Sequence, residues 1–342
     1  MNQYRLIFEK PRHTIIERRT APRPEENELL VANRLSAISA GTEMLIFGGH
    51  FPEHMALDTT IASLAGVFRY PLAYGYSSVG EVIAAGSPDN AGWIGRRVFA
   101  FHPHASHFTA PPSSLLPLPD GISIDDAVFL ANMETAVNLI MDGRPVVGER
   151  VVVLGLGTIG LLVTALLSRF PLEAVVGIDP HRIRRDAAAD FGATDLFSGE
   201  EADLADKPAS DMEESKSDHR ADLIYEVSGN PDALNVALAL AGYHTRLVIG
   251  SWYGTKSTAI DLGGPFHRNR VRVTSSQVST IAPELSGRWT SQRRLQTAWE
   301  MLARCRPGRL ISHRFQIQQA QDAYERIARA PQETLQVVLT YD

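Results

Sequence analysis

The chain has 342 residues, of which 44% are hydrophobic and 21% charged, with a formal net charge of −6. This composition is typical of a globular protein with room for two domains, and its acidic balance argues against a nucleic-acid partner. A single cysteine, Cys305, excludes intramolecular disulfides and any site built from several cysteines. No apolar run approaches the roughly 20 residues of a membrane helix, and the N-terminus has no signal-like core, so we expect a cytoplasmic protein without a membrane partner.

Residues 1–121 are predicted to be rich in β-strand, because short apolar runs alternate there with Pro, Gly and Asn clusters. This pattern favours a compact, partly open barrel or sandwich, with a short helix near 55–64. Residues 122–283 then alternate between helical and strand patterns, which is typical of a doubly wound parallel sheet. The run VRVTSSQVST is expected to close that sheet near residue 281, and the polar stretch Ser198–Arg220 to form a solvated loop. Residues 284–342 return to mixed structure and are expected to rejoin the first domain.

The most informative stretch is Val151–Gly160, VVVLGLGTIG, a strand that runs into a turn and a helix start. Its glycines, Gly155, Gly157 and Gly160, have the G-x-G-x-x-G spacing that permits a sharp turn, approach of a pyrophosphate and close helix packing. Thr158 and Ile159 begin the helix, whose N-terminus favours phosphate. A second strand ends in Asp179, about 20 residues after the middle glycine, where an acid accepts hydrogen bonds from ribose hydroxyls. The pattern therefore predicts NAD(H) rather than NADP(H), whose 2′-phosphate the acid would repel.

These motifs, followed by DLIYEVSGNPDALNVAL, give the chain a resemblance to the medium-chain dehydrogenase/reductase superfamily. The resemblance runs from Gly41–Glu43 to the final LQVVLT. It implies an α/β protein with a GroES-like, β-rich catalytic domain (1–121 and 284–342) and a Rossmann cofactor domain (122–283), with substrate in the interdomain cleft. It also implies a nicotinamide-linked alcohol or polyol dehydrogenase, active as a homodimer or tetramer, with the VRVTSSQVST edge as a candidate pairing site. By position, the resemblance adds the cofactor-binding residues Thr135, Arg184, Val227, Ser228, Gly250 and Ser251.

The departures from the zinc-dependent members are equally informative. Where those enzymes have Cys-Gly-Thr-Asp, this chain has Ala40 to Glu43, and Tyr76 stands where they have a ligand histidine. The helix position of their third ligand corresponds roughly to Ala131. A catalytic zinc needs about three protein ligands, so we expect no metal. The pair GTE and GYSSVGEV is locally similar to the zinc-free dehydrogenases of bacteriochlorophyllide synthesis, which oxidise a hydroxyethyl group.

Without a metal, side chains must handle the hydroxyl proton of the substrate. The candidates are Tyr76, Thr42 and His102, where histidine is attractive as a base because its usual pKa lies near neutrality. Each also has a structural interpretation: a pocket-wall aromatic, a turn residue and a hydrogen-bonded strand end. His102, His104 and His107 could suggest a metal site, but His107 would not share the face of the other two.

The segment Phe47–Tyr74 is longer than this link usually is in the superfamily. It predicts a specificity lid over a bulky or partly apolar small-molecule substrate, or else an insertion packed on the barrel. We therefore expect a zinc-independent, NAD(H)-dependent oxidoreductase acting on a secondary alcohol or ketone. Two alternatives stay open: a zinc-free enone or quinone reductase, and a non-catalytic NAD(H)-binding module.

Overall fold

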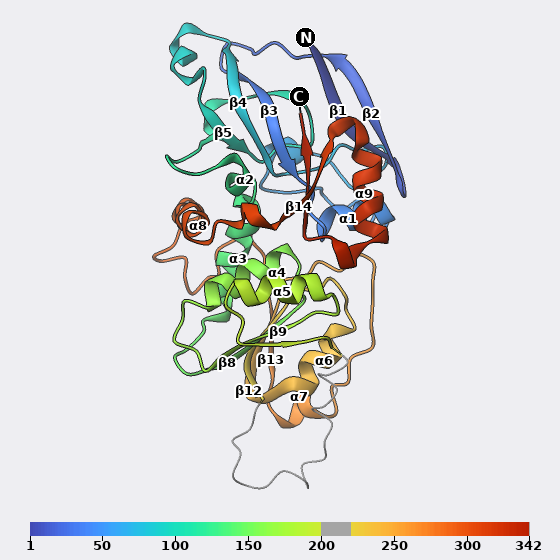
Figure 1. Ribbon diagram of the computed structural model, residues 1–342, viewed down its shortest axis with the longest axis vertical. Helices are drawn as coiled ribbons and strands as arrows, with labels where there is room; N and C mark the ends of the chain where they lie inside the picture. The colour runs from blue at the N-terminus through green and yellow to red at the C-terminus, as the bar shows by residue number, and fades with distance from the viewer. Residues whose placement is uncertain (200–219, 342) are drawn as a thin grey trace. The chain divides into compact units, whose positions relative to one another are not determined.

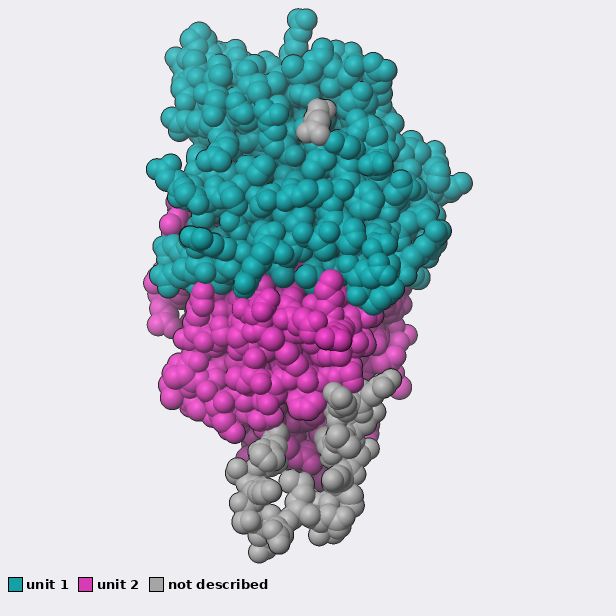
Figure 2. Space-filling view, in the orientation of Figure 1, with its two compact units in different colours: residues 1–131, 298–342 teal, residues 132–297 magenta. Residues whose placement is uncertain are grey.

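The computed structural model describes residues 1–199 and 220–341, so the polar stretch Ser198–Arg220 lies almost entirely outside the described residues. The chain forms two compact units, residues 1–131 with 298–342 and residues 132–297 (Figure 2). Hydrogen bonds explain the first boundary: Ser77 Oγ donates to the Val128 carbonyl, and Gly308 N donates to Asp126 Oδ1 at 2.8 Å. Residues 122–131 therefore pack with the β-rich unit instead of the parallel sheet.

The first unit is built on a seven-stranded sheet and a separate two-stranded hairpin (Figure 1). In the large sheet the order is β14-β15-β3-β4-β5-β7, with β6 also paired to β3. The C-terminal strand β15 pairs antiparallel with β3, which places the end of the chain inside this sheet. The strands are β1 (Asn2–Lys10), β2 (His13–Thr20), β3 (Leu29–Ala37), β4 (Ser78–Ala85), β5 (Arg97–Ala100), β6 (His107–Ala110), β7 (Leu116–Pro117), β14 (Ile311–Gln316) and β15 (Gln336–Thr340).

Strand residues form one core cluster of this unit. Leu29, Val31 and Val82 are fully buried and pack with Phe108 between the strands. Helix α9 packs its buried Tyr324 against Phe47 of α1, with ring centroids 5.4 Å apart. The α-helices are α1 (Thr42–Gly48), α2 (Ile124–Ala127) and α9 (Ala320–Arg329), and the 3-10 turns are η1 (Ala62–Leu64), η2 (Pro88–Trp93), η3 (Pro112–Ser114), η6 (Pro307–Leu310), η7 (Ile317–Gln319) and η8 (Pro331–Glu333).

The second unit is a six-stranded, wholly parallel sheet with the order β10-β9-β8-β11-β12-β13. Helices α4 and α5 lie along one face and α6 and α7 along the other (Figure 1). This is the doubly wound order, in which the chain reverses direction across the sheet between β8 and β11. The strands are β8 (Arg150–Leu154), β9 (Ala174–Ile178), β10 (Asp195–Phe197), β11 (Ala221–Glu226), β12 (Ala241–Ile249) and β13 (Arg272–Ser275). The helices are α3 (Leu130–Gly143), α4 (Thr158–Leu167), α5 (Arg182–Asp190), α6 (Ala233–Leu240), α7 (Pro265–Arg268) and α8 (Ser291–Cys305); α3 and α8 each extend across a boundary in sequence between the two units.

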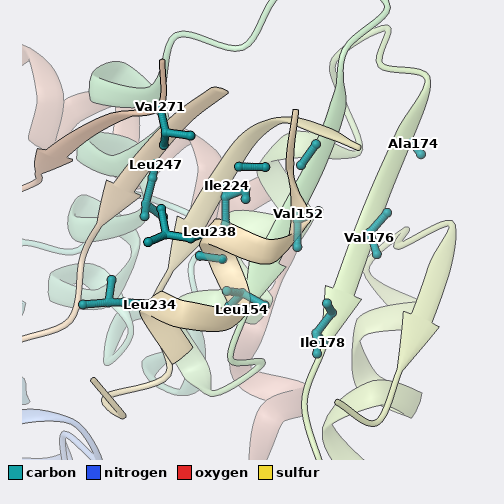
Figure 3. Packing of buried hydrophobic residues seen from close by; sticks show 13 residues of the cluster. Val152, Leu154, Ala174, Val176, Ile178, Ile224, Leu234, Leu238, Leu247 and Val271 are labelled. Atoms are coloured by element: carbon teal, nitrogen blue, oxygen red, sulfur yellow. The ribbon is translucent and has the colours of Figure 1, made fainter. Parts of the chain in front are cut away.

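The core of this unit explains the continuous apolar strands of the sequence. Val152 and Leu154 of β8 pack with Ile224 of β11 under Leu234 and Leu238 of α6 (Figure 3). Strands buried on both faces are apolar without alternation, which is the pattern of VVVL and AVVGI. Together the two units confirm the predicted α/β class.

Two details differ from the sequence expectations. β13 ends at Ser275, so the closing strand is shorter than VRVTSSQVST, and the expected helix near 55–64 is only the single turn η1. Among the described residues, no helix has both the length and the apolar character needed to cross a membrane.

Candidate functional site

The glycine turn after β8 has the geometry that its spacing predicts. Gly155 has a φ of +91°, and a Cβ there would lie 2.4 Å from the Ser228 Cα. A Cβ at Gly160 would lie 1.9 Å from the Gly155 carbonyl oxygen, so only glycine lets helix α4 approach the turn. At Gly157, in contrast, no other atom lies within 4 Å of the position that a Cβ would occupy. This open space beside a helix N-terminus suits an approaching phosphate.

The other predicted cofactor residues follow strand ends that lie side by side. Parallel pairing places in one row the last residues of five strands: Ile178, Leu154, Glu226, Ile249 and Ser275. The predicted residues come directly after these ends and gather at one edge of the sheet: Gly155, Gly157, Thr158, Ile159, Gly160, Asp179, Val227, Ser228, Gly250 and Ser251. Ligands of doubly wound sheets bind at this edge, at the point where the strand order reverses.

Asp179 is buried at the end of β9 and holds the turn together. Its carboxylate accepts hydrogen bonds from the Leu156 N–H and the His181 N–H, each at 2.9 Å. Arg184 lies beside it, with Nη1 3.4 Å from Asp179 Oδ2. The arginine and the acid thus form one partly buried pair. The acid has a structural task in addition to the predicted ribose contact, which stays a prediction.

A buried carboxylate at the end of β11 was not predicted. Glu226 is fully buried, and its Oε1 accepts hydrogen bonds from the Ser228 N–H at 2.8 Å and from the Ser228 hydroxyl. Its Oε2 accepts a hydrogen bond from the Tyr253 hydroxyl, and Ser251 Oγ accepts the Gly229 N–H at 2.9 Å. These bonds fix the loops that carry Ser228 and Ser251. In the sequence, the sign of this carboxylate is an acidic residue at the end of the predicted strand ADLIYE.

Thr135, the remaining predicted cofactor residue, lies on α3 with a partly exposed side chain. Nearby on the same helix, Glu134 accepts hydrogen bonds from the buried guanidinium of Arg294 at 3.1 and 3.2 Å. Asn138 accepts a third from Arg294 at 2.6 Å. This buried arginine therefore ties α8 to α3 inside the second unit.

Two of the three predicted catalytic residues come together in the first unit. Tyr76 Oη donates a hydrogen bond to Ser39 Oγ at 2.6 Å, and the Thr42 N–H approaches the same oxygen at 3.4 Å. Burial raises the pKa of Tyr76 above its usual range, and hydrogen bonding by the Ser39 and Thr42 hydroxyls opposes this. Tyr76 is therefore a neutral phenol at pH 7, partly buried in a cluster of three hydroxyls.

His102 occupies a different environment. Its Nδ1 lies 2.8 Å from the Pro103 carbonyl, and its ring stacks on Phe108 with centroids 4.0 Å apart. Burial lowers the pKa of His102 to about 4, so the imidazole is neutral at pH 7 and a weaker base than the sequence suggested. Among the described residues, no hydrogen bond joins it to Tyr76 or Thr42. The role of His102 stays a prediction.

His104, in contrast, lies at the centre of a buried network. Its Nε2 lies 2.9 Å from Glu43 Oε2 and its Nδ1 2.6 Å from Ser36 Oγ, with the side chains of His104 and Glu43 fully buried. Tyr324 donates a hydrogen bond to the same Glu43 oxygen, and Tyr341 shares a hydrogen bond with Ser36 at 2.6 Å. The network joins β3, α1, α9 and the C-terminal end of the chain.

The His102-to-His107 run does not converge on one point. His104 faces Glu43, while the Nδ1 of His107 lies 3.1 Å from Ser106 Oγ. Within residues 1–199 and 220–341, no three His, Cys, Asp or Glu side chains are grouped so that they could hold a metal ion.

The residues that the resemblance matches to zinc ligands do not supply the ligand set of a catalytic zinc. Ala40 and Ala131 carry methyl groups, which cannot coordinate a metal. Tyr76 offers one phenol oxygen, and its proton is already donated to Ser39. One oxygen falls short of the three or so ligands that a catalytic zinc needs.

The long segment Phe47–Tyr74 forms a folded-back loop anchored by aromatic side chains. Leu57 N donates to the Gly66 carbonyl at 3.0 Å, and Phe68 N donates to the Met55 carbonyl at 2.9 Å. The ring of Phe68 packs on Phe51 at 5.2 Å and on Tyr74 at 5.9 Å between centroids. Tyr74 in turn meets the edge of the Tyr76 ring at 6.1 Å. The loop thus contacts the hydroxyl cluster through a row of aromatic rings.

Comparison with known proteins agrees with this architecture. The family described as zinc-binding dehydrogenase matches residues 158–303. The D-guloside 3-dehydrogenase of Escherichia coli (strain K12) is 26% identical over 288 residues, which cover 81% of each chain. This chain belongs to the medium-chain dehydrogenase/reductase superfamily. As a member, it is an oxidoreductase that uses a nicotinamide cofactor.

Solved structures share the superfamily fold across the whole chain. One is called a short chain alcohol dehydrogenase of Escherichia coli CFT073, complexed with NADH; it has a TM-score of 0.75 and 20% identity and covers 99% of both chains. Another is called a putative zinc-binding dehydrogenase of Sinorhizobium meliloti 1021, bound to NADP; it has a TM-score of 0.76 and 18% identity and also covers 99% of both. At these identities the likeness establishes the fold, and it leaves the choice between NAD and NADP to the residues of this chain.

Proposed function

We propose that this superfamily member is a zinc-independent, NAD(H)-dependent dehydrogenase that interconverts a secondary alcohol and a ketone. The hydroxyl cluster of Tyr76, Ser39 and Thr42 carries the proposal. By resemblance, Tyr76 of this cluster stands where zinc-dependent members have a ligand histidine, and the cluster offers proton donors instead. When bound, the nicotinamide supplies or accepts the hydride.

The second unit provides the cofactor site. Gly155, Gly157 and Gly160 shape the pyrophosphate turn, and Asp179 faces the adenosine ribose. The acid lies beside Arg184, whose positive charge Asp179 already offsets. This pairing favours NAD(H), because a 2′-phosphate would meet a carboxylate rather than a free guanidinium.

The first unit provides the proton chemistry. A neutral phenol donates a hydrogen bond to a carbonyl oxygen and stabilises the negative charge that develops as hydride arrives at carbon. The Thr42 hydroxyl is a second hydrogen-bond donor to the carbonyl oxygen of the substrate. His102, neutral and partly exposed, can accept a hydrogen bond from a substrate hydroxyl.

The substrate class that we propose is based on one relative named above and on the Phe47–Tyr74 segment. The Escherichia coli relative is by name a dehydrogenase of a sugar derivative. We extend this to a carbohydrate or polyol secondary hydroxyl carrying a bulkier, partly apolar substituent. The buried rings of Phe51, Phe68 and Tyr74 pack in a row behind the partly exposed ring of Tyr76, which supplies apolar surface for that substituent.

A substrate panel tests the proposal against its alternatives. Purified protein should oxidise NADH with keto-sugars or aryl-substituted ketones and should reduce NAD with the matching alcohols. Turnover confined to enones or quinones would favour the reductase alternative. Tight NADH binding without turnover on any carbonyl would favour a non-catalytic nucleotide-binding module.

Zinc content gives an independent prediction. Protein purified without chelator should contain well under one zinc per chain, because the ligand positions hold Ala40, Tyr76 and Ala131. Turnover should survive dialysis against a strong chelator. Elemental analysis by mass spectrometry makes the measurement, and one tightly held zinc per chain needed for activity would refute the metal-free mechanism.

Asp179 gives a prediction about cofactor choice. Asp179→Ala should weaken NADH binding about tenfold or more, equivalent to about 1.4 kcal/mol, and should reduce the preference for NADH over NADPH. Asp179→Asn is the matched variant, because its amide oxygen keeps an acceptor for one of the two N–H groups, of Leu156 or of His181, while the charge is removed. It should relax the preference with less loss of structure. Fluorescence titration of both cofactors measures the ratio, and an unchanged ratio in both variants would contradict the assignment.

Strand β13 is the proposed pairing edge of a homodimer or tetramer. All four of its residues are exposed, including Val273. An edge strand with unpaired backbone groups is a template for a second copy. Sedimentation of wild type and Val273→Lys tests this assignment.

A further inference from the structure

Ser39 is a residue to which the sequence gave no role, yet it lies at the centre of the hydroxyl cluster. Its Oγ accepts the Tyr76 hydroxyl at 2.6 Å and faces the Thr42 N–H at 3.4 Å. Its side chain is partly exposed. Ser39 is therefore partly open to solvent while its hydroxyl contacts the candidate proton donor.

The backbone of Ser39 is held independently of its hydroxyl. Its N–H donates to Glu43 Oε1 at 2.8 Å, and its carbonyl accepts the Glu43 N–H at 2.9 Å. Glu43 is itself fixed through its other oxygen by His104 at 2.9 Å and by Tyr324. Removing the Ser39 hydroxyl leaves all of these bonds in place.

The direction of the hydrogen bond from Tyr76 to Ser39 means that Tyr76 needs a second source of protons during turnover. Tyr76 has one hydroxyl proton, and in the structure it is donated to Ser39 rather than left for a substrate. If Tyr76 gives that proton to a carbonyl oxygen, its own oxygen needs another at once, because burial and the nearby carboxylates of Glu43 and Asp58 disfavour a phenolate. The ring of Tyr74 and the hydroxyls of Ser39 and Thr42 complete the surroundings of the phenol.

We propose that Ser39 is the proton relay that resupplies Tyr76, an inference that rests on the dehydrogenase function proposed above. In ketone reduction, hydride adds to the carbonyl carbon and the C–O π bond breaks. The Tyr76 hydroxyl proton bonds to the substrate oxygen, the Ser39 hydroxyl proton moves to Tyr76 Oη, and a solvent proton replaces it on Ser39 Oγ. Alcohol oxidation runs the same transfers in reverse and releases one proton to solvent. Ser39 acts through Tyr76 and is a positioning and relay residue that does not touch the substrate.

Removal and conservative rescue of the hydroxyl test the relay. Ser39→Ala should lower kcat for ketone reduction about 10-fold or more, within the range of proton-transfer catalysis, with NADH affinity unchanged. Ser39→Thr restores a hydroxyl at the same carbon and should return kcat to within about 3-fold of wild type. Ser63→Ala removes a hydroxyl from the exposed loop and should change kcat less than about 2-fold.

A solvent isotope measurement separates a relay from a structural role. In mixtures of H₂O and D₂O, a plot of wild-type kcat against the fraction of D₂O should be curved, because two or more protons move in the same step. Ser39→Ala should show a smaller, linear response. Equal losses in Ser39→Ala and Ser39→Thr with unchanged curvature would mean a packing role and overturn the relay.

Failure of the relay and failure of the proposed function give different results. If Tyr76→Phe abolishes turnover while Ser39→Ala matches wild type in kcat and isotope response, the relay alone is wrong. If Tyr76→Phe retains full turnover, the proposed function has lost its proton donor, and the relay falls with it. Circular dichroism and thermal midpoints of each variant confirm that the comparison is made on folded protein.

Discussion

Replacement of Tyr76 by Phe should lower kcat for ketone reduction about 100-fold or more, with NADH affinity kept within about 3-fold. The loss follows from removing the proton donor, since a positioned acid or base contributes about 10²- to 10⁴-fold to turnover. Cofactor affinity should persist because the glycine turn and Asp179 belong to the other compact unit. Steady-state kinetics in both directions and a fluorescence titration with NADH make the measurement.

Tyr74→Phe is the matched control for this substitution. Tyr74 is buried, lies two residues before Tyr76 and packs edge-on against its ring, with centroids 6.1 Å apart. Its hydroxyl has no part in the Ser39 bond, so kcat should stay within about 3-fold of wild type. Comparable losses in both variants would indicate that packing of the aromatic row, rather than the Tyr76 hydroxyl, supports turnover. Retention of most activity in Tyr76→Phe would remove Tyr76 from the chemistry.

His104→Ala should lower the free energy of unfolding by about 2–5 kcal/mol, because it removes a hydrogen-bond partner from a buried carboxyl group and leaves a cavity in the core. The substitution leaves the Glu43 carboxylate in a fully buried position with only Tyr324 and the Ser39 N–H as donors. It also removes one of the two hydrogen-bond partners of the Ser36 hydroxyl and opens a cavity beside Gly75, against which the imidazole packs. Urea unfolding followed by tryptophan fluorescence and near-ultraviolet circular dichroism gives the difference.

An exposed pair in the same unit provides the comparison for His104. Arg34 Nη2 lies 3.3 Å from Glu81 Oε2, and both side chains are well exposed. Glu81→Ala should cost less than about 1 kcal/mol, because solvent screens such pairs. If His104→Ala were no more destabilising than Glu81→Ala, the buried network would not be a major support of the first unit.

Family and fold class were predictable because their signals are local. Gly155 and Gly160 meet within one turn, and the strand, the helix and Asp179 follow within about 25 residues. The superfamily assignment and the α/β class are confirmed. The buried strands of the second unit were also readable from composition, since parallel strands covered on both faces are continuously apolar.

The catalytic side of the site was less predictable, and His102 and His104 show why. The sequence pattern does not distinguish the two histidines, because an imidazole has the same usual pKa at either position. The structure gives His102 a backbone carbonyl and an aromatic ring, with a pKa of about 4, and gives His104 the buried Glu43. Burial and partner set the chemistry of an imidazole, and both depend on how distant segments pack.

By itself, the sequence determined the fold class, the glycine turn and the place of the cofactor acid, because each depends on residues close together along the chain. The tertiary structure alone decided which side chains share hydrogen bonds in the first unit. Tyr76 reaches Ser39 across 37 residues, His104 reaches Glu43 across 61, and Tyr324 reaches Glu43 across 281. Such partners are selected by the pairing of β15 with β3 and the packing of α9 on α1, which no local spacing encodes. For this reason the sequence pointed to Tyr76 and Thr42 but passed over Ser39, which lies between them.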